Sequence, residues 1–493
     1  MNDELVSYRD LLKCLLCHDA KCSKACPYHL DPARIIRSFR FVNYVGGAKR
    51  VTDACLNCDA PCQKECVLEN PVRIKQILSN AYLKKLNYPK VDSKADIKSE
   101  ICGIEIENPF LLSSSVVAST YDMCKRAFEA GWAGAAFKTI CLMDIHEASP
   151  RFSALKGMDG TIFAFKNIEQ LSDHSVIENL EIFRRLKKEF PNKFLLVSIM
   201  GRNEEEWALL ARESEKAGAD ALELNFSCPN MTEDGTGSDV GQIPELVEKY
   251  TRAVKSAVKI PVIAKLTPNV VSMSPAAEAA KRGGADGLAA INTIKSITEL
   301  NLVEKIYKNH KMEKIAVGGL SGPAVKPIAV RFIAELCQNP NLKDMHISAM
   351  GGVYNYEDAL MFMSLGARSI QITTGVMEIG YRLIDDLTEG LAYFVKACGY
   401  DSLKDMLNMK IESVVDVEEM ERDIVIYPKF IREKCLGCGR CYISCNDGGH
   451  QAIIFDENRT PRLNPNKCVG CHLCVIVCPN GAIVSSDIKV KKK

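Results

Sequence analysis

Length, composition and charge set the first limits on this chain. Its 493 residues are too many for a single hydrophobic core and predict several domains. Hydrophobic residues make up 47% and charged residues 25%, as in ordinary globular proteins, and the formal net charge is +1. This balance excludes a general basic surface for nucleic acid or for acidic membranes.

The amino-terminal stretch and the hydropathy bear on location. MNDELVSYRDLLKC lacks the basic region and the apolar run of a secretory signal. No stretch approaches the ~18 uninterrupted apolar residues of a membrane span. We therefore expect a cytoplasmic protein without a membrane segment. In the cytoplasm, cysteines in CxxC spacing are expected to bind metal. Disulfide bonds, as in a secreted protein, are the alternative.

The first segment, residues 1–90, is rich in cysteine and mainly helical. Helix-like periodicity covers residues 32–48 and 71–86. Eight cysteines follow the spacings C-x2-C-x4-C-x3-C and C-x2-C-x3-C-x3-C: Cys14, Cys17, Cys22, Cys26, Cys55, Cys58, Cys62 and Cys66. Eight thiolates suit two [4Fe-4S] clusters; zinc or a single cluster is the alternative.

The middle segment, residues 98–410, alternates short apolar runs with amphipathic stretches such as 121–131 and 204–218. Eight runs indicate strands: 110–114, 134–139, 194–200, 221–227, 261–267, 287–293, 345–352 and 369–374. Repeated strand–helix alternation favours parallel strands. Eight such strands predict an α/β fold of the (β/α)8 TIM-barrel type, with a doubly wound open sheet as the alternative.

Polar side chains stand at the carboxyl ends of these strands: Lys138, Asn225, Lys265, Asn292 and Thr373. That rim is where TIM barrels build their active sites. An unpaired buried charge is costly, so Lys138 and Lys265 are expected at the mouth of the barrel. Two cations there suit an anionic reduced flavin or a bound oxyanion; plain surface lysines are the alternative.

Cys228 lies in LNFSCPN (224–230), on the loop after the fourth strand, and Gly235, Gly237 and Gly241 follow it. A lone cysteine is usually a small buried hydrophobe. The Gly-rich loop could act as a lid. A thiol with a pKa near ~8.5 is mainly protonated at pH 7 and can donate a proton.

Gly-rich turns after late strands suggest a phosphate site. They lie at 318–322, 350–352 and 373–375, where barrels bind phosphate through backbone N–H groups. With the two lysines they predict flavin mononucleotide (FMN). GTGSDVG (235–241) lacks the spacing of a dinucleotide fingerprint, and no other stretch offers a nicotinamide or FAD site.

The last segment, residues 425–493, repeats C-x2-C-x2-C-x3-C from Cys435 and from Cys468. This is the bacterial ferredoxin run, whose fourth cysteine ligates the other cluster. Two ligand sets are expected: Cys435, Cys438, Cys441 with Cys478, and Cys468, Cys471, Cys474 with Cys445. Zinc, which uses two separated CxxC pairs, is the alternative.

Several of these motifs resemble dihydropyrimidine dehydrogenase. They include CLLCHDAKCSKACP (14–27), FKNIE (165–169), LELNFSCPN (222–230), AKLTPN (264–269), INT (291–293), GGLSG (318–322) and CGRCYISCNDGGHQAI (438–453). The resemblance covers most of the chain. It omits the family's FAD and NADPH domains, which would fall between residues 90 and 98.

The resemblance implies roles for individual residues. Cys228 matches the general acid, and a second set matches positions that bind the pyrimidine ring: Asn167, Glu169, Asn225, Asn292 and Thr293. A third set matches positions at FMN: Lys138, Thr139, Ser227, Lys265, Gly322, Gly351, Gly352, Thr373 and Thr374. Amides, a hydroxyl and a carboxylate can read the alternating N–H and C=O groups of uracil.

The implied reaction is reduction of the 5,6 double bond of uracil or thymine. FMN would supply hydride to C6 and Cys228 a proton to C5, with electrons arriving through four [4Fe-4S] clusters. Because no nucleotide site is found, an FAD- and NAD(P)H-binding partner subunit or a ferredoxin is expected as donor, in an oligomeric assembly.

Two departures from the family's sequence pattern and two alternative functions stay open. Asn230 stands where the animal enzyme has His, and Gln76 could replace Cys55 as a ligand, since the family uses one Gln. One rival is a dihydroorotate dehydrogenase, against which Glu169 argues because orotate carries a carboxylate. The other is an electron-relay subunit with a catalytically idle barrel.

Overall fold

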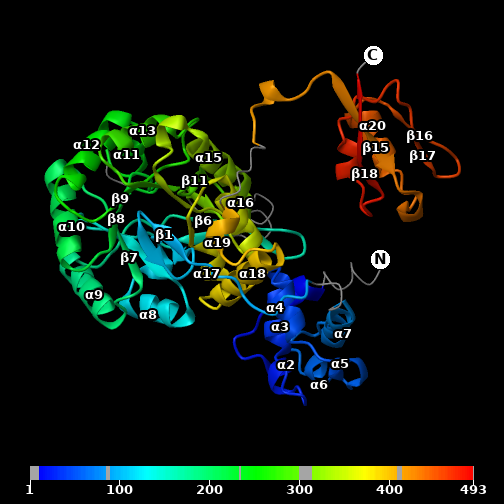
Figure 1. Cartoon of the computed structure of the whole chain (residues 1–493), viewed down its shortest axis with the longest axis horizontal. Coiled ribbons are helices and arrows are strands. Elements are labelled where there is room, and N and C mark those ends of the chain that lie inside the picture. Colours follow the sequence, from blue (N-terminus) through cyan, green and yellow to red (C-terminus); the bar gives the residue numbers. More distant parts are fainter. Residues whose placement is uncertain (1–9, 85–88, 232–234, 299–313, 408–413, 492–493) are drawn as a thin grey trace. The chain divides into compact units, whose positions relative to one another are not determined.

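The structure is a computed structural model, and it describes residues 10–84, 89–231, 235–298, 314–407 and 414–491. The chain divides into two compact units, Met1–Ile411 and Glu412–Lys493. The first unit contains a barrel and a group of short amino-terminal helices, and the second contains the elements from β15 (Ile424–Phe430) to β18 (Ile483–Lys491) (Figure 1). The predicted carboxyl-terminal limit of the barrel, residue 410, lies outside the described residues.

The eight predicted strands form a closed parallel barrel, so the open-sheet alternative is wrong. They are β3 (Phe110–Leu112), β4 (Gly134–Ile140), β7 (Phe194–Ile199), β8 (Ala221–Asn225), β9 (Val262–Lys265), β10 (Gly287–Ala290), β13 (His346–Ala349) and β14 (Ser369–Ile372). Every residue in them is buried, because side chains fill the interior and helices cover the outside. This double burial explains why the strands read as continuous apolar runs.

Helices ring the strands (Figure 1). They are α8 (Tyr121–Ala130), α9 (Val176–Glu189), α10 (Glu204–Lys216), α11 (Ser238–Gly241), α12 (Pro244–Lys255), α13 (Ser274–Arg282), α15 (Lys326–Gln338), α16 (Tyr356–Leu365), α17 (Thr374–Ile379), α18 (Leu383–Ala397) and α19 (Leu403–Leu407). Thr120, Ser175 and Asn203 cap α8, α9 and α10 by accepting hydrogen bonds from first-turn N–H groups. The helices between successive strands carry the chain back to the end of the barrel where each strand begins. The carboxyl ends of all eight strands therefore lie at one rim.

A small antiparallel sheet, not predicted from the sequence, lies at that rim. Its strands run in the order β11 (Ile294–Ser296), β12 (Gly318–Ser321), β6 (Ile162–Asn167) and β5 (Phe152–Lys156). The predicted Gly-rich turn at 318–322 is therefore largely wrong, because residues 318–321 pair with strands on both sides. Gly319 is required there, since a Cβ would lie 2.0 Å from Thr293 Oγ1.

The barrel is preceded by a hairpin of β1 (Ser99–Ile101) and β2 (Ile104–Ile106). Ser99 Oγ donates to the carbonyl of Arg368, just before β14. The hairpin therefore packs at the amino-terminal ends of the strands, opposite the rim that holds the functional side chains.

Short helices form the amino-terminal part: α2 (Lys21–Lys24), α3 (Pro32–Arg40), α4 (Tyr44–Lys49), α5 (Ala54–Asn57), α6 (Pro61–Lys64) and α7 (Ile74–Lys84). The run predicted at 32–48 is two helices, because Asn43 caps α4 by accepting from the Gly46 N–H. Ile35, Ile36 and Leu78 share a core with Cys55 and Cys62.

A buried ion pair joins these helices to the barrel. Arg37 Nε of α3 donates to Asp386 of α18 at 2.6 Å, and the two side chains are 8% and 1% exposed. Ser38 Oγ and Asn43 Nδ2 also donate to Asp386, at 2.7 and 3.2 Å. The amino-terminal part therefore packs specifically on helix α18.

The second unit is small and built around cysteines. Its elements are β15 (Ile424–Phe430), α20 (Arg440–Gly448), β16 (Ile453–Phe455), β17 (Pro461–Leu463), α21 (Leu473–Ile476) and β18 (Ile483–Lys491). Cys441, Cys445 and Cys474 share its core with Ile453 and Ile483. In the described part of the whole chain, no helix combines the length and apolarity needed to span a membrane.

Candidate active site

One cavity opens at the carboxyl ends of the barrel strands, with a volume of about 1090 Å³ including space open to solvent. All of the predicted substrate, flavin and catalytic residues line it except Ser227: Lys138, Thr139, Asn167, Glu169, Asn225, Cys228, Lys265, Asn292, Thr293, Gly322, Gly351, Gly352, Thr373 and Thr374. The structure thus gathers side chains from strands that are far apart in sequence.

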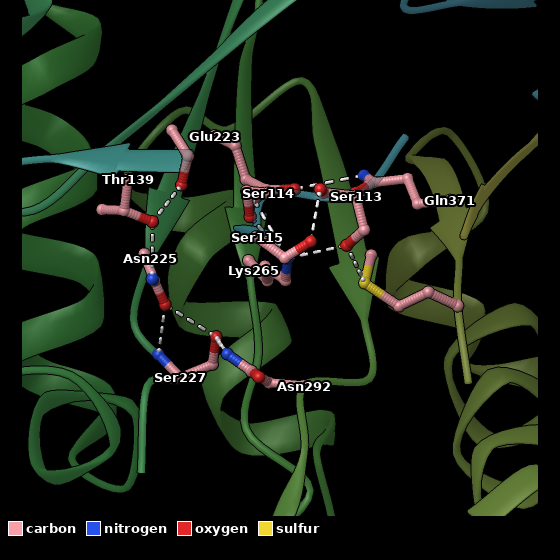
Figure 2. Close-up of polar contacts among 12 residues, drawn as sticks. Ser113, Ser114, Ser115, Thr139, Glu223, Asn225, Ser227, Lys265, Asn292 and Gln371 are labelled. Atoms are coloured by element: carbon pink, nitrogen blue, oxygen red, sulfur yellow. Dashed lines mark hydrogen bonds and ion pairs between the residues drawn. The ribbon is translucent and has the colours of Figure 1, made fainter. Parts of the chain in front are cut away.

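Ser227 lies directly behind this surface in a chain of hydrogen bonds (Figure 2). Asn225 Nδ2 donates to Thr139 Oγ1 at 2.9 Å, and Ser227 Oγ donates to Asn225 Oδ1 at 2.9 Å. Asn292 Nδ2 donates to Ser227 Oγ at 2.8 Å. These contacts fix the amide orientations of Asn225 and Asn292 before any ligand binds.

Glu169 is paired with cations on both oxygens. Lys138 Nζ donates to its Oε2 at 2.8 Å and Arg151 to its Oε1 at 3.0 Å. Lys138 Nζ also lies 3.8 Å from Glu147 Oε1. Two carboxylates and two cations leave this group without net charge. Glu169 therefore opposes an anionic ring by offsetting these cations rather than as an isolated charge, and its role against orotate stays a prediction.

Cys228 is buried, with 6% of its surface exposed, and it lines the cavity. Burial raises the pKa of its thiol to about 11. The thiol is therefore protonated throughout the physiological range, as a proton donor requires.

Two of the glycines after Cys228 are required by close packing, and the lid role of this loop stays a prediction. A Cβ on Gly237 would lie 2.4 Å from the Cys228 carbonyl oxygen, and one on Gly241 would lie 1.9 Å from that of Phe226. Ser238 N donates to the Cys228 carbonyl at 2.9 Å. Residues 232–234 of this loop lie outside the described residues.

Lys265 occupies the floor of the cavity beside a second carboxylate. Its Nζ lies 3.2 Å from Glu223 Oε1 and donates to Ser114 Oγ at 2.8 Å (Figure 2). Both charged side chains are almost fully buried, at 3% and 0% exposure. Lys265 is therefore a buried, paired lysine and not a surface lysine.

The clustered cysteines gather in fours. Three cavities are lined by Cys14, Cys17, Cys22 and Cys66, by Cys435, Cys438, Cys441 and Cys478, and by Cys445, Cys468, Cys471 and Cys474. Burial and the neighbouring Cys26 and Cys58 thiols raise the pKa of both Cys55 and Cys62 to about 11, which identifies Cys26, Cys55, Cys58 and Cys62 as neighbours. No such group in the described ranges is arranged to hold a single metal ion. The exchange of the last cysteine, predicted for the carboxyl-terminal pair, recurs at the amino-terminal end.

Comparison with known proteins identifies the family. Residues 96–395 match the family model described as dihydroorotate dehydrogenase. The chain belongs to the dihydroorotate dehydrogenase family. Residues 429–484 match a 4Fe-4S dicluster domain, so this member carries an iron–sulfur domain after its barrel.

Relatives place the chain more narrowly within the dihydroorotate dehydrogenase family. It is 50% identical over 398 residues to the Escherichia coli K12 NAD-dependent dihydropyrimidine dehydrogenase subunit PreA, covering 80% of this chain and 97% of that protein. The chloroplastic dihydropyrimidine dehydrogenase (NADP(+)) of Arabidopsis thaliana is 33% identical, over 64% of this chain and 76% of that protein. The chain is therefore an oxidoreductase of the dihydropyrimidine dehydrogenase type.

Two further matches are more distant. The catalytic subunit of dihydroorotate dehydrogenase B (NAD(+)) from Pyrococcus abyssi is 36% identical, over 64% of this chain and 99% of that protein. A crystal structure of DHODH from Eimeria tenella in complex with ferulenol superposes with a TM-score of 0.53 at 15% identity, over 64% of this chain and 89% of that chain. This last likeness shows the shared fold alone.

Sequence reasoning missed four polar positions at the site: Ser114, Glu147, Arg151 and Glu223. Ser114 is the last residue of the predicted strand 110–114, so the rule that strand ends build the rim could have found it. Glu223 is a carboxylate inside an apolar strand, which is itself a signal. Glu147 and Arg151 lie on a loop, and no local pattern marks them.

Proposed function

We propose that this chain reduces the 5,6 double bond of uracil or thymine to the dihydropyrimidine. The observation that carries the proposal is the single cavity surface shared by a buried, protonated Cys228 and the prearranged amides of Asn225 and Asn292. Asn167, Glu169 and Thr293 complete a set of donors and acceptors suited to the alternating N–H and C=O groups of a pyrimidine.

The cavity residues fit FMN. Gly322, Gly351 and Gly352 line it with positive φ angles of 89°, 128° and 77°. A Cβ on Gly351 would lie 2.6 Å from Ala329 Cβ, and one on Gly352 would lie 2.9 Å from the Gly322 carbonyl oxygen, so only glycine leaves backbone exposed here. We infer that these glycines with Thr373 and Thr374 hold the phosphate, and that Lys138, Thr139, Ser227 and Lys265 surround the ring.

When bound, FMN would take up two electrons, one at a time from the iron–sulfur clusters, and would supply them as hydride to C6 of the pyrimidine. The residues of the chain would then have two tasks. The amide and carboxylate side chains would orient the ring, and Cys228 Sγ would give its proton to C5. The balance is two electrons and two protons per pyrimidine, with the Cys228 proton replaced from solvent.

The iron–sulfur part is proposed as four [4Fe-4S] clusters. The carboxyl-terminal sets are those predicted from the ferredoxin spacing, and the cavity linings support them. At the amino-terminal end we propose Cys14, Cys17, Cys22 and Cys66 for one cluster and Cys26, Cys55, Cys58 and Cys62 for the other. The closeness of Cys55 to Cys26 and Cys58 favours it over Gln76 as a ligand.

The electron donor is proposed to be a separate FAD- and NAD(P)H-binding subunit or a ferredoxin. Two observations support this. The Escherichia coli and Pyrococcus abyssi relatives are each named as subunits, and the sequence of this chain has no dinucleotide fingerprint. The assembly would then place the barrel in a cytoplasmic oligomer.

Replacing Glu169 tests whether the site prefers a neutral pyrimidine ring, such as uracil, to the anionic ring of orotate. Glu169→Gln is expected to lower kcat/KM for uracil roughly 10- to 150-fold, since a hydrogen bond to a charged group contributes about 1.5–3 kcal/mol. Lys138 and Arg151 would lose their counter-charge, so orotate should inhibit the variant more strongly than wild type. The control is Glu181→Gln, whose carboxylate pairs with Arg184 on the exposed face of α9.

Steady-state uracil reduction and orotate inhibition are measured for both variants. A Glu169→Gln protein with kcat/KM for uracil within twofold of wild type would remove Glu169 from the binding set. Loss of uracil reduction with no change in orotate inhibition would contradict the charge balance.

Because the pKa of Cys228 is raised, we expect the rates of uracil reduction and of dihydrouracil oxidation to depend differently on pH. The thiol form is the acid for reduction, and it is lost only as the pH rises through about 11. The proton-transfer step of uracil reduction should therefore keep its rate between pH 7 and 9. Oxidation of dihydrouracil needs the thiolate and should speed up about tenfold per pH unit over that range. Single-turnover rates in both directions test this, and a fall in the reduction rate near pH 8.5 would contradict it.

A further inference from the structure

A buried carboxylate lies one layer below the floor of the active-site cavity. Glu223 is two residues before Asn225 on β8, so both side chains point into the barrel, with Glu223 deeper. It is fully buried, and its partners Lys265, Ser114 and Gln371 line the cavity.

Three polar side chains contact the carboxylate of Glu223. Ser114 Oγ donates to Oε1 at 2.6 Å and Lys265 Nζ lies 3.2 Å from the same atom. Gln371 Nε2 donates to Oε2 at 3.1 Å (Figure 2). Lys265 also donates to Ser114 Oγ, so the serine connects the two charged groups by a second route. Such complete pairing is what allows two charges to stay buried together.

The pairing of Lys265 with Glu223 should affect how strongly a flavin in this cavity holds its electrons. Two-electron reduction of FMN with uptake of one proton leaves one negative charge on its ring. A lysine beside the ring stabilises that charge, and an uncompensated lysine in a low-dielectric interior would do so strongly. A flavin that holds its electrons too tightly passes them poorly to a pyrimidine.

We propose that Glu223 sets the reduction potential of the bound flavin by offsetting the charge of Lys265. It is a positioning residue, since it acts through Lys265 and does not itself line the cavity. This inference rests on the proposed function in one respect, that FMN occupies the cavity. The carboxylate keeps the flavin potential low enough for transfer to the pyrimidine.

The test is spectroelectrochemical titration of FMN in the full-length chain, without any pyrimidine. Glu223→Gln removes the charge and keeps the shape. Gln371 Oε1, which has no partner among the described residues, can accept from the new amide if the Gln371 side chain turns over. The midpoint potential is expected to rise, with the equilibrium constant for two-electron reduction at least tenfold larger, ~30 mV.

Glu223→Asp distinguishes charge from structure. It keeps the carboxylate but draws it one methylene away from Lys265, so its potential should lie between those of wild type and Glu223→Gln. The same order is expected for the affinity of the oxidised flavin for sulfite, which also adds negative charge to the ring. If Glu223→Gln fails to retain FMN, the potential of Glu223→Asp still tests the predicted direction of the shift, which is a rise in the flavin midpoint potential. The control is Glu248→Gln, a carboxylate paired with Arg252 and Arg282 on the outer helices.

An unchanged or lowered potential in Glu223→Gln would overturn the proposal, as would a shift in Glu223→Asp equal to that in Glu223→Gln. These outcomes are independent of the substrate. If uracil failed to reoxidise the wild-type flavin, the proposed reaction would fail while the order of potentials still decided the role of Glu223. A wild-type chain that bound no flavin would overturn both.

Discussion

Cys228→Ala is expected to lower uracil turnover by ~10²–10⁴-fold, the usual contribution of a general acid. The thiol is buried in the cavity and its pKa is raised to about 11, so it carries a proton at neutral pH. A methyl group cannot donate that proton. The substitution removes only one sulfur atom from the cavity wall, so flavin and iron contents should stay at wild-type levels.

The measurement is single-turnover uracil reduction by the pre-reduced variant, together with flavin and iron quantification. Cys398→Ala is the control, because Cys398 is an exposed thiol outside the cavity. Cys228→Ser should fall between wild type and Cys228→Ala, since a hydroxyl can still donate a proton. A Cys228→Ala protein with near-wild-type turnover would remove Cys228 from the chemistry.

Arg37→Met is expected to destabilise the protein by about 3–5 kcal/mol. Arg37 balances the buried carboxylate of Asp386, which is 1% exposed, and methionine fills a similar volume without a charge. Ser38 and Asn43 still donate to Asp386, so the loss should lie near the lower end of that range. Because this pair fastens α3 to α18, the amino-terminal helices should loosen first.

Urea unfolding followed by circular dichroism, with limited proteolysis of residues 10–84, measures this loss. Arg184→Met is the matched control, because Arg184 forms an exposed pair with Glu181 that contributes about 0–1 kcal/mol. The double variant Arg37→Met with Asp386→Asn should regain part of the stability, since no charge is then left unpaired and the amide oxygen can still accept from Ser38 and Asn43. If Arg37→Met cost less than 1 kcal/mol, this contact would not hold the two parts together.

The barrel could be predicted because its strands carry strong local signals. Each is a short apolar run, and Asn225 and Lys265 mark two of the strand ends. One geometric rule, that parallel strands in a barrel end at one rim, then placed five residues at the cavity that they line: Lys138, Asn225, Lys265, Asn292 and Thr373. The family resemblance supplied the other predicted site residues.

The rest depends on contacts that no local pattern records. The rim sheet was missed because β12 is Gly-rich and β11 has three residues, so neither shows strand periodicity. That sheet and its flanking loop bring Arg151 to Glu169, which changes the charge of the site. The grouping of Cys66 with Cys14 likewise depends on how α2, α3 and α7 pack, and spacing alone leaves it open.

The most direct test of the account is anaerobic titration of the dithionite-reduced wild-type protein with uracil, recorded by flavin absorbance and by product analysis. We predict that the oxidised flavin spectrum returns and that one dihydrouracil forms per electron pair released. A flavin that stays reduced in excess uracil but is reoxidised by orotate would contradict the assignment of uracil or thymine as the substrate.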